Sequence, residues 1–206
     1  MKPKDHWERV YTTKAVGAVS WFRHHLEQSI RMIEGTGVPL SASIIDVGGG
    51  ASTLVDDLLS CGYSSLTVLD LSHAALVASQ ARLGPLASRV QWLEADVTAA
   101  ALPQHGYDVW HDRAVFHFLT TAEQRAAYVR AVIRAVKPGG HVVVATFAAG
   151  GPTRCSGLPV MRYRAEQLYA EFGEPFELLQ QAAEDHRTPS GAVHKFIYCR
   201  FRKRNV

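Results

Sequence analysis

The chain has 206 residues, of which 47% are hydrophobic and 20% are charged, and its formal net charge is +3. This length and composition are typical of one globular domain with a sizeable core. No apolar run approaches the length needed to cross a bilayer, so we do not expect a membrane protein. The three cysteines are Cys61, Cys155 and Cys199, which form no C-x-x-C pair, so neither a disulfide framework nor a zinc site is expected.

Other function classes receive little support from the charged residues. Residues 1–7 carry charges without an apolar core behind them, so we expect no signal peptide and a cytoplasmic location. The ten histidines include no H-E-x-x-H pair, and we expect no metal site. Basic residues are scattered apart from the end between Arg200 and Arg204, which is more often solvated than bound to nucleic acid. The oligomeric state stays open.

Strands and helices alternate along most of the chain. Apolar residues at helical spacing predict an amphipathic helix from Val19 to Ile33, followed by a glycine- and proline-containing loop over 35–39. Ser72 is a predicted helix N-cap, and Gly84-Pro85 ends that helix. The predicted strands cover residues 43–47, 66–69, 90–94, 107–111 and 141–146, and the predicted helices between them cover 52–61, 72–83 and 121–136.

This alternation predicts the fold class. Strands joined by helix-length segments form a parallel sheet with right-handed crossovers and helices on both faces. Two further strand-like runs, Phe176–Ala183 and Val193–Phe201, flank a polar loop over 188–191 and predict an antiparallel hairpin at one edge. We therefore expect an α/β protein with a doubly wound, mostly parallel seven-stranded sheet and an antiparallel terminal hairpin.

The first predicted strand runs directly into an acid and three glycines, Asp46 followed by Gly48, Gly49 and Gly50. Glycines at such a turn let the backbone approach a ligand closely. Thr53 stands where a dinucleotide-binding G-x-G-x-x-G would have its third glycine. An acid before the first glycine suits a cationic amine better than phosphates, which favours S-adenosylmethionine (SAM), with a purely structural turn as the alternative.

Acidic residues also follow the next three strands, at the sheet edge where such folds bind ligands. Asp70 can accept both hydroxyl protons of a ribose, and Asp96 can accept from the exocyclic amine of adenine. Asp112 leaves the fourth strand beside Arg113. Each acid by itself could be a helix cap or part of a surface ion pair. Four acids at four consecutive strand ends favour a nucleoside-binding site.

These motifs resemble those of class I SAM-dependent methyltransferases over nearly the whole chain. Similar motifs are Ile45–Gly50 (first), Val68–Leu71 (second), Ala95–Val97 (third), Tyr107–Trp110 (fourth strand) and Lys137–Gly140 (the turn before the fifth strand). The resemblance implies SAM as the cofactor, with Gly48 and Gly50 beneath its methionyl part and Asp70 on its ribose. Ser52 replaces the third glycine of the family's first motif and is expected to cap the next helix. The predicted cofactor-binding residues are Trp7, Tyr11, Asp46, Gly48, Gly49, Gly50, Asp70, Leu71, Asp96, Val97 and His111.

Two stretches resemble particular groups within the class. The stretch from Asp108 to Ala114 is similar to the D-x-x-x-D-R-G-A of thiopurine S-methyltransferase-like enzymes. His6–Tyr11 resembles the aromatic opening of that group and of some small lysine methyltransferases. The likeness implies one domain over 1–206, with a helical lid over 1–38 and a Rossmann-like core over 39–206. Trp7, Tyr11 and Trp21 would then cover the cofactor, or else serve as aromatic anchors of an N-terminal helix.

The implied function is methyl transfer to a small-molecule nucleophile, with a thiol as one candidate acceptor. We expect Asp112 at the rim of the site, assisting deprotonation or holding the substrate. Arg113 is expected to bind an acidic substrate group or to pair with Asp112. Protein-lysine methylation is the first alternative, and an NAD-dependent oxidoreductase or a non-catalytic nucleotide-binding module ranks below it. The loop over 148–161, which contains Cys155, is expected to border the substrate pocket as a lid.

Overall fold

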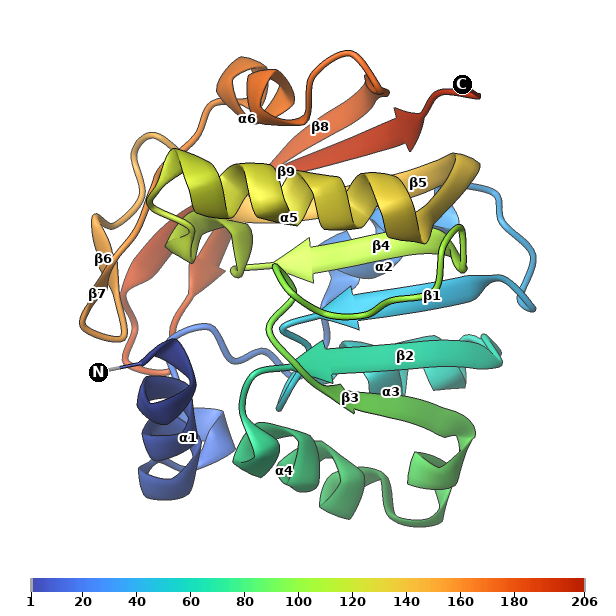
Figure 1. The fold of residues 1–206 in the computed structure, drawn as a ribbon. Coiled ribbons are helices and arrows are strands. Elements are labelled where there is room, and N and C mark those ends of the chain that lie inside the picture. Colours follow the sequence, from blue (N-terminus) through green and yellow to red (C-terminus); the bar gives the residue numbers. More distant parts are fainter. Residues whose placement is uncertain (1, 206) are drawn as a thin grey trace.

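Five parallel strands end at the same edge of one seven-stranded sheet (Figure 1). The structure is a computed structural model that describes residues 2–205. Neighbours from β3 to β5 are parallel, and β9 is antiparallel to both β5 and β8. Across the sheet the strands are β3 (Val90–Glu94), β2 (Ser65–Asp70), β1 (Ser43–Val47), β4 (Tyr107–Arg113), β5 (Val136–Phe147), β9 (Val193–Lys203) and β8 (Phe176–Arg187). The strand order reverses between β1 and β4, which creates the switch point where such sheets bind ligands.

Helices cover both faces of this sheet, so the predicted doubly wound fold is confirmed. On one face α2 (Glu27–Glu34), α3 (Leu54–Ser60) and α4 (His73–Leu83) pack against β1 and β2 through buried aliphatic side chains. The other face is covered by α5 (Ala122–Ala135) and α6 (Ala165–Phe172), with Trp110 and Tyr128 among the largest buried side chains. Figure 1 shows α5 lying across the front of the sheet.

Local capping confirms two predicted helix starts. Ser72 precedes α4, and its side chain accepts a hydrogen bond from the amide of Ala75 (3.2 Å). Thr121 and Gln124 form a reciprocal capping box at the start of α5. Such caps satisfy backbone donors that a helix end leaves without partners.

The N-terminal region differs from the prediction. Two short helices, α1 (Pro3–Thr13) and the 3₁₀ turn η1 (Val16–Ala18), precede α2, which begins at Glu27 rather than near Val19. The segment before α2 is irregular and is held by the start of α3, because the Asp57 carboxylate accepts from the Leu26 amide (3.1 Å) and Thr53, the N-cap of α3, donates to the Arg23 carbonyl (3.0 Å). The helical spacing of apolar residues over 19–26 was therefore misleading.

Several strands run further than predicted. Residues 112 and 113 continue β4 because they pair with β5. The Lys137–Gly140 turn lies within β5, next to a register shift opposite Tyr107 and Val109, instead of preceding it. In the predicted 148–161 loop, β6 (Arg154–Cys155) and β7 (Leu158–Pro159) form a small hairpin. Its turn residues Ser156 and Gly157 both have positive φ, as a type I′ turn requires.

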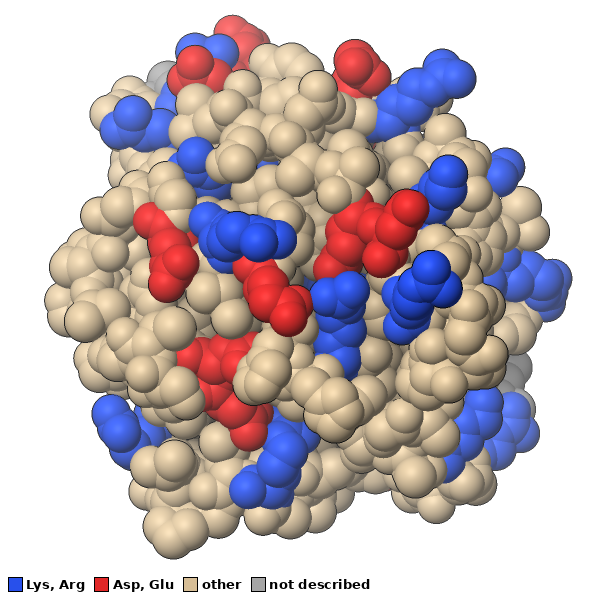
Figure 2. Space-filling view, turned by 180° about the vertical axis from the view of Figure 1, so that it is seen from behind, with Lys and Arg blue, Asp and Glu red and all other residues tan. Residues whose placement is uncertain are grey.

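Charged side chains are mixed in sign over the face seen from behind, where acidic and basic residues are interspersed across the middle (Figure 2). The structure contains ion pairs such as Arg82–Asp56 and Lys137–Asp108 (both 2.7 Å). Among residues 2–205, no helix is both long and apolar enough to span a bilayer. The same residues contain no group of three metal-ligating side chains.

Gly48 lies where a side chain would be both strained and sterically blocked. Its φ is +68°, and a Cβ built on it would overlap the Val115 side chain. We expect Gly48→Ala to lower the free energy of unfolding by about 2–4 kcal/mol. Urea denaturation of the ligand-free protein measures this loss.

The chain provides a matched control for that substitution. Gly37 has φ +73°, but no heavy atom beyond its two chain neighbours lies within 4 Å of the position that a Cβ would take there. Gly37→Ala should therefore show only the backbone strain, about 1–2 kcal/mol. Equal losses for the two variants would contradict a steric role of Val115.

Candidate functional site

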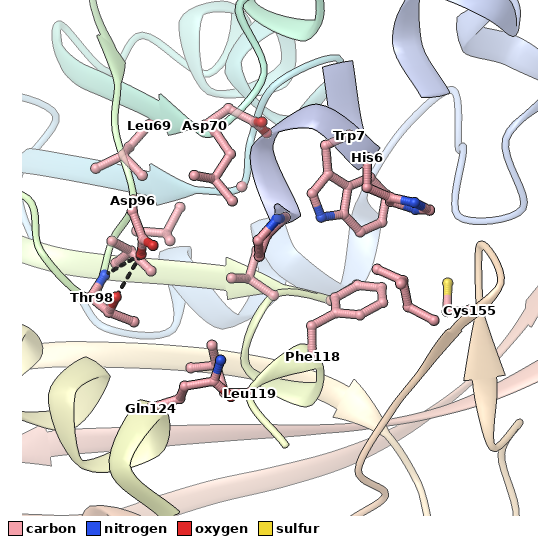
Figure 3. A pocket seen from close by; sticks show the side chains of 18 of the residues that line it. His6, Trp7, Leu69, Asp70, Asp96, Thr98, Phe118, Leu119, Gln124 and Cys155 are labelled. Carbon is pink, nitrogen blue, oxygen red and sulfur yellow. Dashed lines mark hydrogen bonds between the residues drawn. The ribbon is translucent and has the colours of Figure 1, made fainter. Parts of the chain in front are cut away.

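A cavity of about 340 Å³ opens at the carboxyl ends of the parallel strands (Figure 3). Its lining combines strand ends with α1, the turn after β4 and the β6–β7 hairpin, segments far apart in the sequence. Eight of the predicted residues lie on its surface: Trp7, Tyr11, Gly48, Asp70, Leu71, Asp96, Val97 and Arg113. Asp46, Gly49 and His111 line a smaller adjoining cavity of about 30 Å³.

Glycines after β1 allow two carboxylates to pack against the backbone. A Cβ on Gly50 would overlap the carboxylate of Asp70, and one on Gly49 would overlap that of Asp46. The Gly50 carbonyl is fixed from behind by the hydroxyl of Ser79 (2.5 Å). The glycine turn therefore brings the acids of two neighbouring strands close to one short backbone segment.

Asp70 is a buried carboxylate on the cavity surface. Its Oδ1 accepts from the Ser72 amide (2.8 Å). Burial and the charge of Asp46 raise the pKa of Asp70 to about 7, while amide donors from Ser72, Gly50 and Leu71 act in the opposite direction. Perturbed carboxylates in clefts are typical of functional sites.

Asp96 lies at the end of the cavity beside Val97 (Figure 3). Its Oδ1 accepts from both the amide (2.8 Å) and the hydroxyl (2.7 Å) of Thr98. Because both bonds converge on one oxygen, they orient the carboxylate and leave Oδ2 for another donor.

Behind the glycine turn, Asp46, His111 and Ser29 form a buried chain of hydrogen bonds. Nδ1 of His111 lies 2.7 Å from Oδ1 of Asp46, and Nε2 lies 2.9 Å from the Ser29 hydroxyl. Oδ2 of Asp46 is buried without a hydrogen-bond partner among residues 2–205. His111 therefore orients Asp46 from below and does not itself reach the larger cavity.

Aromatic side chains cover the opposite end of the cavity. Trp7 of α1 packs edge-to-face on Trp21 (ring centroids 5.6 Å apart) and on Phe118 (5.0 Å). The indole of Trp21 donates to the Tyr11 hydroxyl (3.2 Å). Figure 3 shows Trp7 and Phe118 beside Cys155 of β6.

Glu8 joins α1, which carries Trp7 and Tyr11 of the aromatic cover, to the start of α4. Its carboxylate accepts from the Ser72 hydroxyl (2.8 Å) and from the Ala74 amide (3.2 and 3.3 Å to its two oxygens). Glu8 therefore satisfies hydrogen-bond donors at the start of α4, immediately after Asp70. A negative charge is favourable at this position because the N-terminal end of a helix carries a partial positive charge. A second contact joins the elements, since Lys4 pairs with Glu94 at the end of β3.

This contact leads to a kinetic prediction. Glu8→Gln removes the negative charge and can place the side-chain NH₂ group against the Ser72 hydroxyl and the Ala74 amide, which are themselves donors. We expect the contact between α1 and α4 to be weakened by about 1 kcal/mol. We expect the dissociation rate of S-adenosylhomocysteine (SAH), the demethylated form of SAM, to rise about five-fold. Stopped-flow fluorescence measures that rate. Asp5→Asn, an exposed change on the same helix, should leave it unaltered, and an unchanged rate for Glu8→Gln would refute the role of Glu8.

Arg113 reaches the cavity through a side chain that is only 6% exposed. Its guanidinium donates to the Tyr198 hydroxyl (2.9 Å), the Trp21 carbonyl (3.1 Å) and Glu184 (3.4 Å). It also lies over the Phe196 ring, 4.4 Å from the centroid. Arg113 thus links the terminal hairpin to the aromatic cover, and it does not pair with Asp112.

Asp112 points away from the cavity, so the expectation that it lies on the rim is wrong. Successive residues of β4 face opposite sides of the sheet, and Asp112 faces α5. It is fully buried and accepts from Tyr128 (2.6 Å), Val115 (2.9 Å) and Phe116 (3.1 Å). Burial raises the pKa of Asp112 to about 6, against the lowering by Tyr128 and the amides.

Some residues at the site were not predicted. In the sequence, Glu8 looks like any charged residue on a helix surface and Phe118 like any apolar residue in a turn, so no motif marks either of them as part of a site. Cys155 does lie at the cavity, as its loop suggested, but burial raises the pKa of its thiol to about 11. A neutral buried thiol is unreactive.

Comparison with known proteins points in one direction. A family model described as a methyltransferase domain matches residues 44–140. The chain is similar to EEF1A lysine methyltransferase 2 of Homo sapiens, 25% identical over 192 residues, which cover 86% of this chain and 75% of that one. The protein of the same name from Danio rerio is 24% identical over 192 residues, covering 86% and 76%.

Solved structures share the whole fold. One comes from a study of the conversion of a disulfide bond into a thioacetal group during echinomycin biosynthesis (TM-score 0.80, 16% identity, 99% of this chain and 93% of that chain). Another is the Burkholderia thailandensis 1,6-didemethyltoxoflavin-N1-methyltransferase with bound 1,6-didemethyltoxoflavin and SAH (TM-score 0.73, 17% identity, 98% and 87%). At these identities the likeness shows the fold.

Proposed function

Because this chain is a class I SAM-dependent methyltransferase, we propose that its methyl acceptor is a small apolar molecule bearing a thiol or a similar soft nucleophile. The observation that supports this most is the apolar end of the cavity, between α1 and the β6–β7 hairpin. Trp7, Trp21 and Phe118 meet Cys155 and Leu158 there. The two acids on the surface of the larger cavity, Asp70 and Asp96, lie at the strand ends instead.

The residues present fit SAM. The unpartnered Oδ2 of Asp46 can receive the ammonium group at the methionyl end, above the glycine turn. In this proposal Asp70 accepts the ribose hydroxyls and Asp96 the adenine amine, with Leu71 and Val97 as apolar contacts; all four residues line the cavity. Trp7 and Tyr11 of α1 cover this site as a lid, whereas α2, which also lies within residues 1–38, packs on the sheet as part of the core. When bound, SAM supplies a methyl group that its sulfonium makes electrophilic.

The protein then has to position the acceptor and exclude water. Holding the acceptor and the methyl group in the correct relative position can by itself lower the activation free energy of such a displacement by roughly 7–11 kcal/mol. The aromatic cover of Trp7, Trp21 and Phe118 performs both tasks. The guanidinium of Arg113, at the cavity beside Gly48, favours a thiolate over a thiol. Asp112 acts at a distance, by holding the amides of residues 115 and 116.

Protein-lysine methylation is the second candidate. Its support is the likeness to the EEF1A lysine methyltransferases, at 25% identity or less. A lysine side chain also has an apolar stem that aromatic rings can accommodate. The cavity between two covering segments suits a small molecule better than a side chain on a folded protein surface.

Labelled SAM separates the two candidates. The enzyme is incubated with methyl-labelled SAM and a cell lysate, which is then divided into protein and small-molecule fractions. Label in the small-molecule fraction is expected, and label found only in protein would refute the small-molecule proposal. Asp70→Asn, run in parallel, shows which label depends on this site.

A further inference from the structure

Cys155 places a thiol of the protein itself at the apolar end of the cavity, where the proposed acceptor binds (Figure 3). It is only 5% exposed, so it experiences the surroundings that an acceptor thiol would enter. Burial raises the pKa of Cys155 to about 11, whereas a hydrogen bond with Ser20 and the charges of Arg113 and Lys14 lower it. The loss of water at this end therefore disfavours a thiolate more than the positive charges favour one.

The charges that reach this end of the cavity are positive. Arg113 lines the cavity, and Lys14 is an exposed residue directly after α1 whose charge acts on both Cys155 and His6. Among residues 2–205, no acid contributes to the pKa of either of these two side chains. An acceptor that enters as an anion is therefore attracted by these charges.

The remaining titratable groups at this end do little to remove a proton from a bound thiol. Burial raises the pKa of Tyr11, so its hydroxyl stays neutral. Nε2 of His6 is enclosed by the protein. Burial and the charges of Arg9 and Lys14 lower the pKa of His6, which makes this imidazole a weak base.

We propose that the acceptor is a thiol acidic enough to be ionised in solution near neutral pH, so that it enters the cavity as a thiolate. This inference rests on the proposed methyl transfer and adds the class of acceptor, an acidic thiol rather than an alkyl thiol. The thiolate's electron pair forms the bond to the methyl carbon as the carbon–sulfonium bond breaks, and the electrons of that bond remain on the cofactor's sulfur. The thiol gives its proton to water before it binds, so no proton is transferred in the cavity.

The pKa of Cys155 indicates how strongly the cavity selects for acidity. At pH 7.5, a bound alkyl thiol with the same pKa of about 11 would be ionised in roughly one molecule in three thousand. A thiol whose pKa in water is about 5 would remain mostly ionised after an increase of the same size. Only the second kind of thiol supplies a nucleophile in most of the complexes that form.

Two thiols of different acidity test the inference with the wild-type enzyme at saturating SAM. At pH 7.5, 4-nitrothiophenol is ionised, whereas benzyl mercaptan is mostly protonated. A thiolate of lower pKa is intrinsically the weaker nucleophile, so an enzyme that ionised both thiols would methylate benzyl mercaptan faster. We expect the opposite order, with kcat/KM about 100-fold higher for 4-nitrothiophenol. Equal values, or a higher value for benzyl mercaptan, would overturn the inference.

The pH profile of each thiol separates ionisation from the fit of the molecule in the cavity. With benzyl mercaptan, kcat/KM should rise about ten-fold per pH unit between about pH 7 and 9, following the thiolate in solution. With 4-nitrothiophenol it should stay within about two-fold. A plateau for benzyl mercaptan below about pH 8 would show that the enzyme removes its proton, and the inference would then be wrong. Asp70→Asn, measured in parallel, shows which methylation depends on the cofactor site.

An optical measurement without turnover completes the test. The thiol and thiolate forms of 4-nitrothiophenol absorb at different wavelengths, so its spectrum in the SAH complex reports its ionisation state. The thiolate spectrum is expected at pH 7.5, and a bound thiol, or no binding, would contradict the inference. Methylation of neither thiol would refute the proposed function and this inference with it, whereas faster methylation of benzyl mercaptan would refute the inference alone.

Discussion

Asp70→Asn should weaken binding of SAM and SAH about 10²–10³-fold, the largest loss of affinity expected for one substitution at this site. The reason is the loss of a buried carboxylate that, in the proposed site, accepts two ribose hydroxyl protons, worth about 3–4 kcal/mol together. The fold should tolerate the change, since burial already raises the pKa of Asp70 to about 7 and so disfavours its charge. Titration calorimetry measures the affinity and urea denaturation the stability.

The pH dependence supplies a second readout for the same residue. Below about pH 7 the ligand-free Asp70 is increasingly protonated, so SAH affinity should fall by up to about ten-fold per pH unit. Its contribution to ligand-free stability has the opposite sign. The folded state holds this proton up to about pH 7 and the unfolded chain only up to about pH 4, so that contribution decreases as pH rises between these values.

Asp185→Asn, which alters an exposed acid on β8, serves as the control. It should leave affinity and its pH profile as in the wild type. An Asp70→Asn protein that binds SAH normally would show that the ribose is held elsewhere.

Arg113→Met should lower the free energy of unfolding by about 3–5 kcal/mol, the largest loss of stability expected at the site. The substitution leaves Glu184 without one of its two arginines and removes the donor to the Trp21 carbonyl. Thermal unfolding should move down by about 10 °C in a protein of this size. SAH affinity should fall as well, because Trp21 and Tyr11 lose their anchor.

A double variant distinguishes a buried unpaired charge from lost packing. Arg113→Met with Glu184→Gln removes both charges and should recover part of the stability. Arg130→Met, on the exposed side of α5, should change stability by less than about 0.5 kcal/mol. A double variant less stable than the sum of the single changes would contradict the charge explanation.

Local and periodic signals predicted the frame of the site. Buried strands, the Ser72 cap and the terminal hairpin follow from patterns of only a few residues, and the structure confirms them. Parallel strands place their carboxyl ends at one edge, so Asp70 and Asp96 could be assigned to a common cavity without coordinates.

Elements whose conformation depends on distant partners were not predicted. The segment over 19–26 has helical spacing but is held in an irregular conformation by Asp57 of α3 and by Thr53, the N-cap of that helix. The β6–β7 hairpin likewise went unpredicted within a stretch rich in glycine and proline, and the helix α6 after it was not predicted either. Tertiary hydrogen bonds and burial override weak local preferences in such segments.

For the site residues, too, some features follow from the sequence and others only from the tertiary structure. The sequence by itself determined the sheet, the glycine turn and the acids around a cofactor cavity, because periodicity and strand ends are local properties. Only the tertiary structure decided that Asp112 faces α5 and that Glu8 caps α4. These placements depend on β-strand register and on the docking of α1, which bring together residues distant in the chain.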